Sequence, residues 1–217
     1  MSEFAKILAT PGVEEICELR GRLGFMAYHG GNLEWLTDVI ATHAARRSRA
    51  SLYAVIQPPG MRDHLPSTRV RPEESPALAE FVEHVDVVVT IHGFGRRGLF
   101  SSLLLGGQNR SFAEHIGDAL RRHLPSYDIR TDLNAIPQRL RGLHDRNPVN
   151  LPRERGVQIE LPPRVRGTSP MWWDWERDDL TPHTEWLIDG LVDAANTWAG
   201  SGATAPVTLP VTEASSS

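Results

Sequence analysis

The sequence predicts a three-layer α/β/α sandwich around a mixed, mostly parallel sheet. Helical and strand-like patterns alternate through most of the 217 residues, which is typical of such a fold. Residues 85–91 are almost continuously β-branched, as expected for a central strand that is buried on both faces. Polar, chemically versatile side chains follow several of the predicted strands. Because ligands bind outside the carboxyl ends of the strands in these sheets, that edge is the expected site.

Composition favours one globular domain over residues 1–199, followed by a small, polar tail over residues 200–217 that we expect to be disordered. Hydrophobic residues make up 40% of the chain, which is enough for a sizeable core. Cys17 is the only cysteine, so the sequence excludes an intrachain disulfide and a cysteine-rich metal site. The net charge of −4 gives no electrostatic case for nucleic acid. The chain shows neither a membrane-spanning run nor a secretory pattern, so we expect a cytoplasmic protein, for which release by lysis would leave no sequence signal.

The first half of the chain shows two strand–helix repeats after a loop and a short segment over residues 1–20. A glycine pair, Gly30-Gly31, follows the first strand and permits a tight turn. Apolar residues then recur at helical spacing, which places Glu34 in the first turn of the predicted helix. Ser75 and Pro76 are typical of a helix N-cap and first helical position. The predicted elements are strands over residues 23–28 and 51–57 and helices over 33–47 and 76–84.

The second half continues the alternation around one long irregular segment. Ser111 and Glu114 match the spacing of a capping box. Gln158 and Glu160 alternate with apolar residues, so both should point to one face of their strand. The predicted elements are strands over residues 85–91, 99–105, 127–131 and 156–161, helices over 112–123 and 182–198, and a loop over 133–155.

His29, Glu34 and His92 are the candidate metal ligands. His29 and His92 end predicted strands, and the glycine turn brings Glu34 close to the first of them. Two imidazoles and a carboxylate suit Zn²⁺ and leave one position open for water, whose pKa bound zinc lowers to about 7. Glu160, at the end of another strand, is the candidate general base.

Structural roles are the alternative for each of these residues. Glu34 could serve only as a favourable charge at a helix start, Glu160 could pair with a nearby arginine, and His92 could make a structural hydrogen bond. The other seven histidines are most simply surface or hydrogen-bonded residues: His43, His64, His84, His115, His123, His144 and His183.

At these residues the sequence resembles the bacterial and phage poly-γ-glutamate hydrolases, which are compact relatives of the zinc carboxypeptidases. The matching stretches, in the family's order over residues 22–197, are His29-Gly30-Gly31-Asn32-Leu33-Glu34, Thr90-Ile91-His92-Gly93, Gly106-Gly107, and residues 156–162 with Arg166 following. The resemblance implies a carboxypeptidase-like fold, a zinc ion held by His29, Glu34 and His92, and Glu160 as the catalytic carboxylate.

The family's Asn-x-x-Asn-Arg pattern is incomplete in this chain. Asn147 and Asn150 match it, but Leu151 stands where the resemblance leads us to expect an arginine that holds a substrate carboxylate. Leucine cannot replace the bidentate clamp of an arginine. The candidate replacements are Arg110, Arg153 and Arg155, and Arg166 is a further candidate for substrate binding.

Two functions follow. The first is a zinc-dependent amide hydrolase, or metallopeptidase, that acts on poly-γ-glutamate or a related acidic peptide. The alternative is a non-catalytic module that binds acidic ligands on a degenerate hydrolase scaffold, for which Leu151 is the main support. The cluster Trp172, Trp173 and Trp175 is either packing for a long loop or a lid over the site.

Overall fold

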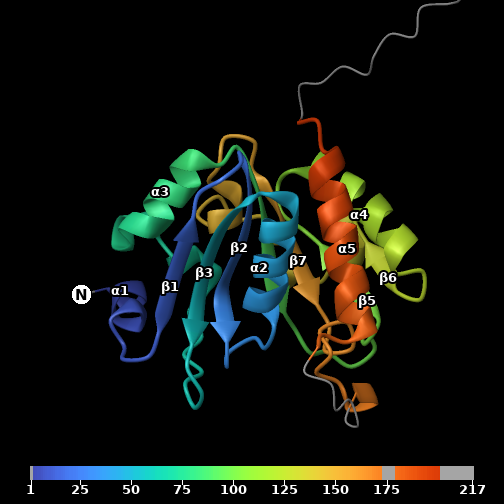
Figure 1. Cartoon of the computed structure of the whole chain (residues 1–217), viewed down its shortest axis with the longest axis horizontal. Coiled ribbons are helices and arrows are strands. Elements are labelled where there is room, and N and C mark those ends of the chain that lie inside the picture. The colour runs from blue at the N-terminus through green and yellow to red at the C-terminus, as the bar shows by residue number, and fades with distance from the viewer. Residues whose placement is uncertain (1, 173–178, 201–217) are drawn as a thin grey trace, which may run out of the picture.

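The computed structural model describes residues 2–172 and 179–200, and its centre is a seven-stranded sheet in the order β1-β3-β2-β4-β7-β5-β6 (Figure 1). The strands are β1 Glu14–Glu18, β2 Leu23–Gly31, β3 Ser51–Gln57, β4 Val87–Gly93, β5 Ser102–Leu105, β6 Asp128–Arg130 and β7 Gly156–Leu161. The helices are α1 Glu3–Leu8, α2 Thr37–Ser48, α3 Pro76–His84, α4 Arg110–His123 and α5 Pro182–Thr197. β1 is antiparallel to β3 and β5 is antiparallel to β7, whereas the other neighbours are parallel. The predicted mixed, mostly parallel sheet is confirmed.

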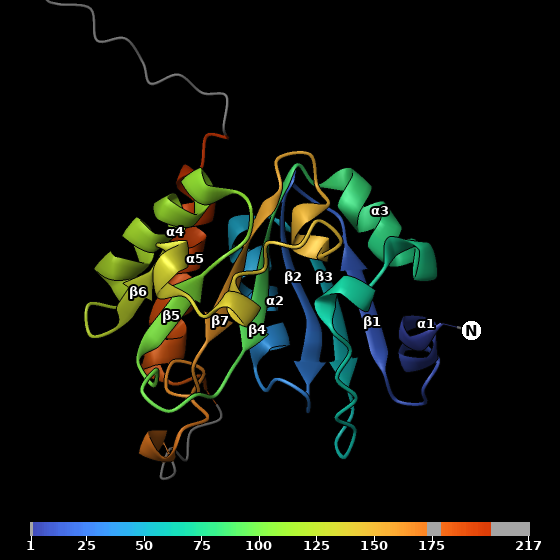
Figure 2. The same cartoon turned by 180° about the vertical axis from the view of Figure 1, so that it is seen from behind.

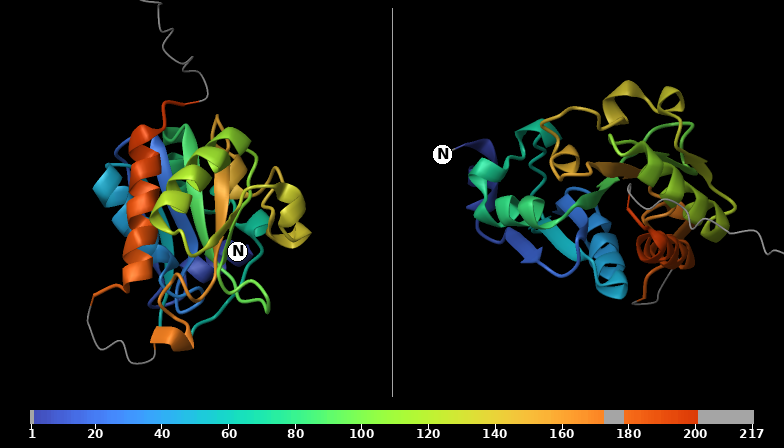
Figure 3. Two further views of the ribbon diagram at one scale, coloured as in Figure 1. Left: turned by 90° about the vertical axis from the view of Figure 1, so that its right-hand side faces the viewer. Right: turned by 90° about the horizontal axis from the view of Figure 1, so that it is seen from above.

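Two helical layers cover the sheet. Helices α2, α4 and α5 pack apolar side chains against one face. On the other face α1 and α3 cover β2 and β3, and residues 133–150, which include the 3₁₀ turns Gln138–Leu140 and Pro148–Asn150, lie over β4 and β7 (Figure 2). The view from above places this segment on the opposite side of the sheet from α2 and α5 (Figure 3). The predicted three-layer sandwich is therefore confirmed.

Several predicted boundaries are confirmed, because local signals decide them. β3, α3 and β7 span the predicted residues. Ser75 caps α3 by accepting a hydrogen bond from the backbone N–H of Leu78, and Thr181 caps α5, which ends at Thr197.

Several boundaries differ from the prediction, and three of them are the starts of α2, α4 and β5. α2 begins at Thr37, because Leu36 has a φ of 68° and a left-handed residue cannot lie within an α-helix. Glu34 therefore lies in the turn before the helix and not in its first turn. α4 begins at Arg110, and its N-cap is Asn109, whose side chain accepts from the N–H of Phe112. β5 begins only at Ser102, because the three residues before it form a turn.

Some predictions fall outside the described residues. The tail over 201–217 and two of the three clustered tryptophans, Trp173 and Trp175, belong to this group. Trp172 is described, and its indole N–H donates to the carbonyl of Arg164. The boundary of the single domain stays a prediction. Within the described ranges, no helix is both long and apolar enough to cross a membrane.

The register of the sheet places the polar side chains on one face. His92 lies opposite Glu160, and Thr90 lies opposite Gln158, so all four side chains point to the face covered by residues 133–150. On β2, Met26 pairs with Thr90, so Tyr28, two residues further on, points to the same face. The alternate residues of β7 (Val157, Ile159 and Leu161) join the apolar core under α2, α4 and α5.

Candidate metal centre and active site

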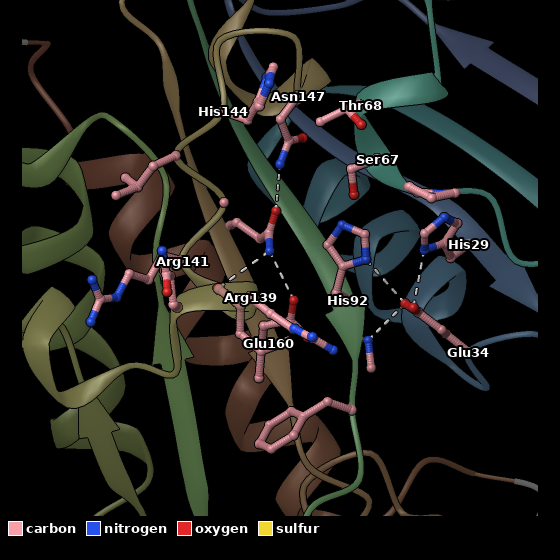
Figure 4. A pocket seen from close by; sticks show the side chains of 18 of the residues that line it. His29, Glu34, Ser67, Thr68, His92, Arg139, Arg141, His144, Asn147 and Glu160 are labelled. Carbon is pink, nitrogen blue, oxygen red and sulfur yellow. Dashed lines mark hydrogen bonds and ion pairs between the residues drawn. The ribbon is translucent and has the colours of Figure 1, made fainter.

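A cavity of about 760 Å³ opens at the carboxyl ends of β2, β4 and β7 (Figure 4). One wall is the sheet, and the other walls are the loop after β3 and the segment before β7. The polar residues that line it include His29, Glu34, His64, Ser67, His92, Arg139, Arg141, His144, Asn147, Gln158 and Glu160. Gln57 ends β3 beside this opening, so the loop that follows starts at the same edge as the site.

A tight turn after β2 returns Glu34 to His29. Gly31 has a φ of 66°, and a Cβ at this position would lie 2.3 Å from the carbonyl oxygen of Gln57, so only glycine fits. Its N–H donates to the carboxylate of Asp38 at 2.9 Å. The N–H of Glu34 donates to the carbonyl of His29 at 3.0 Å, which closes the turn.

The structure brings the three predicted ligands together. The Nδ1 atom of His29 lies 3.1 Å from one carboxylate oxygen of Glu34, and the Nδ1 atom of His92 lies 3.3 Å from the other. Both histidines are only 3% exposed. The N–H of Gly93 donates to Glu34 Oε2 at 2.8 Å and holds the carboxylate in place.

The hydrogen bond on the far side of the His29 ring indicates that a cation fits between His29 and Glu34. His29 Nε2 lies 2.9 Å from the carbonyl oxygen of Leu65, which can only accept, so this nitrogen carries the proton. His29 Nδ1 then presents a lone pair to a carboxylate, unless the ring is doubly protonated. Burial lowers the pKa of His29 and opposes that second proton. A metal ion satisfies such a set of donors, and the pattern of an outer acceptor behind a ligating imidazole is common in zinc sites.

The two carboxylates of the cavity differ in their preferred protonation state. Burial by itself would raise the pKa of Glu34, but the neighbouring His92 and His29 outweigh it and lower the pKa. For Glu160 burial dominates and raises the pKa to about 7, against weaker opposing effects of His92 and Gln158. Glu34 is thus suited to hold a cation, and Glu160 is suited to exchange a proton near neutral pH.

Glu160 has the position that a general base requires. It lies directly across from His92 in the sheet, is 5% exposed and lines the cavity. Its Oε1 atom accepts a hydrogen bond from Gln158 Nε2 at 2.9 Å. Among the described residues it forms no ion pair with an arginine, although the charge of Arg166 acts on it.

Sequence reasoning took His64 as a surface or hydrogen-bonded histidine, and the structure places it at the cavity. One ligand atom from each of His64, His29 and Glu34 lies within 4.8 Å of the others. The His64 side chain is exposed, and in the described part of the chain no hydrogen bond orients its ring. The signal that could have found it is topological, because its loop follows β3 at the same sheet edge as His29.

Three of the residues predicted to bind substrate have other partners. The amide of Asn150 is fully buried and bonds to the backbone of Gln108, Gly142 and His144. Arg110 donates to backbone carbonyls beside the start of α4, including that of Gly107. Arg153 pairs with Asp86 and Glu154 near the amino end of β4, away from the cavity. These contacts are structural.

Asn147 and Arg166 do lie at or near the site. Asn147 lines the cavity and is 4% exposed. Arg166 is buried, donates to the carbonyls of Leu161 and Trp35, and packs against Gly93. Arg166 therefore supports the wall of the site with its guanidinium group.

The cations on the cavity wall are Arg139 and Arg141, which the sequence did not single out. Within the described ranges neither side chain forms an ion pair, and the guanidinium of Arg141 donates only to the carbonyl of Ile136. Leu151, where an arginine was expected, borders a separate hollow that also contains Arg71 and Arg146. Nothing in the composition of residues 133–155 indicated which of its arginines would line the cavity.

The fold and the site define the class of α/β enzymes that carry a histidine–carboxylate centre at the carboxyl edge of a mostly parallel sheet. Over residues 9–183 the sequence matches the family model described as poly-gamma-glutamate hydrolase, and the chain belongs to this family. The chain is thus a hydrolase by family, and the resemblance described above is confirmed.

Two solved structures share this fold. The structure of a bacteriophage poly-gamma-glutamate hydrolase superimposes with a TM-score of 0.72 at 18% identity, covering 87% of this chain and 91% of that one. The zinc-free apo form of YNDL superimposes with a TM-score of 0.65 at 14% identity, covering 85% and 90%. A comparison with curated proteins finds no match.

Proposed function

We propose that this chain is a zinc-dependent hydrolase that cuts γ-glutamyl amide bonds in poly-γ-glutamate or a related acidic peptide. The observation that carries the proposal is the convergence of His29 Nδ1 and His92 Nδ1 on the two oxygens of Glu34, at 3.1 and 3.3 Å, with Glu160 opposite His92. In this proposal His29, Glu34 and His92 hold the metal, and Glu160 is the general base.

The residues of the chain divide the chemistry between them. When bound, zinc supplies Lewis acidity, which polarises a carbonyl and lowers the pKa of water. Glu160 takes the proton from the attacking water and returns it to the leaving amine, because a carboxylate with a pKa of about 7 exchanges protons readily at neutral pH. The name of the zinc-free relative accords with zinc as the metal.

An acidic substrate is supported by the charge on the cavity wall. Arg139 and Arg141 line the cavity without carboxylate partners in the described residues, and Arg139 is exposed. A guanidinium group recognises a carboxylate through two parallel hydrogen bonds. These arginines are the candidate cations for the side-chain or α-carboxylates of a glutamyl polymer.

The metal content of the purified protein tests the proposal first. We expect about one zinc per chain, loss of the zinc in His92→Ala, and no change in the control His43→Ala, which alters an exposed histidine on α2. The wild-type protein should shorten poly-γ-glutamate, as followed by size-exclusion chromatography. Absence of zinc from wild-type protein after zinc is offered would refute the proposal.

Glu160→Gln tests the role of the base. We expect the variant to keep its zinc and to lose turnover by about 10²–10⁴-fold, the usual contribution of general-base catalysis. Retained turnover would contradict the assignment. Binding of the polymer by wild-type protein without cleavage would favour the alternative of a non-catalytic binding module.

A further inference from the structure

We propose that Tyr28, Asn147 and Gln158 are positioning residues that form one hydrogen-bonded chain from the metal ligand His92 to the base Glu160. The chain sets which nitrogen of His92 faces the metal and which oxygen of Glu160 faces the substrate. This inference rests on the proposed function, because it assigns partners to the ligand and base named there.

Four consecutive hydrogen bonds make up the chain, and Figure 4 draws the two that link Asn147 to Glu160 through Gln158. His92 Nε2 lies 2.9 Å from the hydroxyl of Tyr28, and that hydroxyl lies 3.3 Å from Asn147 Oδ1. Asn147 Nδ2 lies 2.8 Å from Gln158 Oε1, and Gln158 Nε2 lies 2.9 Å from Glu160 Oε1. The five residues are each at most 5% exposed, so water does not compete for these bonds.

Groups outside the chain determine the direction of each amide. The backbone N–H of Val149 can only donate, and it lies 3.3 Å from Asn147 Oδ1, which identifies that atom as the oxygen. The carboxylate of Glu160 and the carbonyl of Leu140 accept, and both face Gln158 Nε2. Asn147 Nδ2 therefore donates to Gln158, and Asn147 Oδ1 accepts from Tyr28.

The direction of the amides decides the state of His92. Asn147 Oδ1 can only accept, so Tyr28 donates its one hydroxyl proton to it, and the Tyr28 oxygen accepts from His92 Nε2–H and from the Ser67 hydroxyl. In the singly protonated ring, which is the form that can bind a metal, His92 Nδ1 then carries the lone pair, and it is the atom that lies beside Glu34. At the other end, Gln158 donates to Glu160 Oε1, and Oε2, to which no described residue donates, is available for proton transfer.

The chain also gives Asn147 a role other than direct capture of a substrate carboxylate. Both polar atoms of its side chain form hydrogen bonds within the protein, Nδ2 with Gln158 and Oδ1 with Tyr28. Gln158 is buried on β7, where an amide is costly unless hydrogen bonds satisfy it. Polar groups at these buried positions are therefore best explained by their orienting effect on His92 and Glu160.

Tyr28→Phe tests the metal end of the chain, and Tyr53→Phe is its matched control. Tyr53 is also fully buried and donates its hydroxyl to Glu15, on the strand next to β3 and outside the cavity lining. We expect Tyr28→Phe to weaken zinc binding about 10- to 100-fold, the usual effect of losing a partner behind a ligating histidine. Competition with a chelator measures the affinity, and the absorption spectrum of the Co²⁺-loaded protein should shift in Tyr28→Phe alone.

Gln158→Met tests the catalytic end and serves as the second variant if Tyr28→Phe fails to fold. We expect lower kcat with little change in KM and about one bound zinc per chain. In the double variant that combines Tyr28→Phe and Gln158→Met, kcat should fall by less than the product of the two single-variant factors. One substitution already interrupts the hydrogen-bonded chain, so the second has less left to disrupt.

Two results would refute the orienting role of the hydrogen-bonded chain and leave the proposed function intact. One is a zinc affinity of Tyr28→Phe equal to that of Tyr53→Phe, and the other is a kcat of the double variant that falls by the product of the two single factors. Absence of zinc from the wild-type protein would overturn both.

Discussion

At the scale of single residues, burial gives two carboxylates of one cavity opposite tendencies. Glu34 lies between two imidazoles, which lower its pKa, whereas Glu160 has one amide partner and a pKa raised to about 7 by burial. The same residue type can thus hold a cation at one position and exchange a proton at the other.

Glu160 should make the stability of the metal-free protein depend on pH. Its pKa rises from 4.5 in the unfolded chain to about 7 in the native protein, so between these values the native state binds the extra proton. Stability therefore falls as pH rises through this window, by about 3 kcal/mol at most. Urea unfolding of metal-free wild type and Glu160→Gln should show the variant gaining relative stability from about pH 5 to about pH 8. A difference that stays constant with pH would contradict the raised pKa.

His64 and His92 should contribute unequally to metal binding. His92 is buried and oriented by Tyr28, whereas His64 is exposed and has no orienting hydrogen bond among the described residues. We expect His64→Ala to weaken zinc binding less than about 10-fold and His92→Ala to abolish stoichiometric binding, because a pre-oriented ligand loses less entropy. Chelator competition measures both. An equal loss of zinc affinity in the two variants would instead indicate that His64 is as important a ligand as His92.

At the scale of elements, short turns and caps place the site residues. The left-handed residues Gly31 and Leu36 enclose the turn that returns Glu34 to His29. Spacing alone could predict that Glu34 follows a glycine turn, but it could not reveal that Leu36 adopts a positive φ and delays α2 to Thr37. Packing of the turn against β3 overrides the local helical pattern.

The observed cap of α4 predicts unequal effects at two neighbouring positions. Asn109 accepts from the N–H of Phe112 and donates to the carbonyl of Glu154, whereas Ser111 donates only to Asn109. We expect Asn109→Ala to lower the free energy of unfolding by about 1–2 kcal/mol and Ser111→Ala to lower it by less than about 0.5 kcal/mol. Urea denaturation measures both. The reverse order would support the capping box that the sequence suggested.

At the scale of the whole molecule, the parallel arrangement of β2, β4 and β7 gathers residues that are far apart in sequence. His29, His92 and Glu160 each lie within two residues of the carboxyl end of one of these strands, and the register sets His92 opposite Glu160. The loop after β3 and the segment before β7 then supply His64 and Arg139 from the two sides. A bound metal should therefore add to the free energy of unfolding of the strands and segments that contribute its ligands.

Metal removal should therefore lower the stability of the entire domain. Zinc at about 100 times its dissociation constant adds about 2.7 kcal/mol to the free energy of unfolding, which corresponds to about 5–10 °C in Tm for a chain of this size. Differential scanning calorimetry with and without chelator measures the shift in wild type. His92→Ala is the control, since it should show no shift. An equal Tm of the wild-type protein with and without chelator would contradict a metal bound within the native state.

The sequence by itself predicted the architecture and the convergence of His29, Glu34 and His92. Local signals such as the Ser75-Pro76 start of α3 and the alternation in β7 defined β3, α3 and β7, and the placement of His29, His92 and Glu160 near strand ends predicted that they share one edge. These properties are local or follow from the rules of parallel sheets, so one sequence suffices to infer them.

Only the tertiary structure decided which side chains surround that centre. His64 and Arg139 line the cavity because irregular segments cross the sheet. By contrast, Arg110 and Asn150 bond to backbone groups, and Arg153 pairs with carboxylates at the surface. The path of such segments depends on packing between residues distant in sequence, and no periodic pattern encodes it. The same holds for the hydrogen-bonded chain from His92 to Glu160, which exists only because three strands and the segment before β7 meet at one face of the sheet.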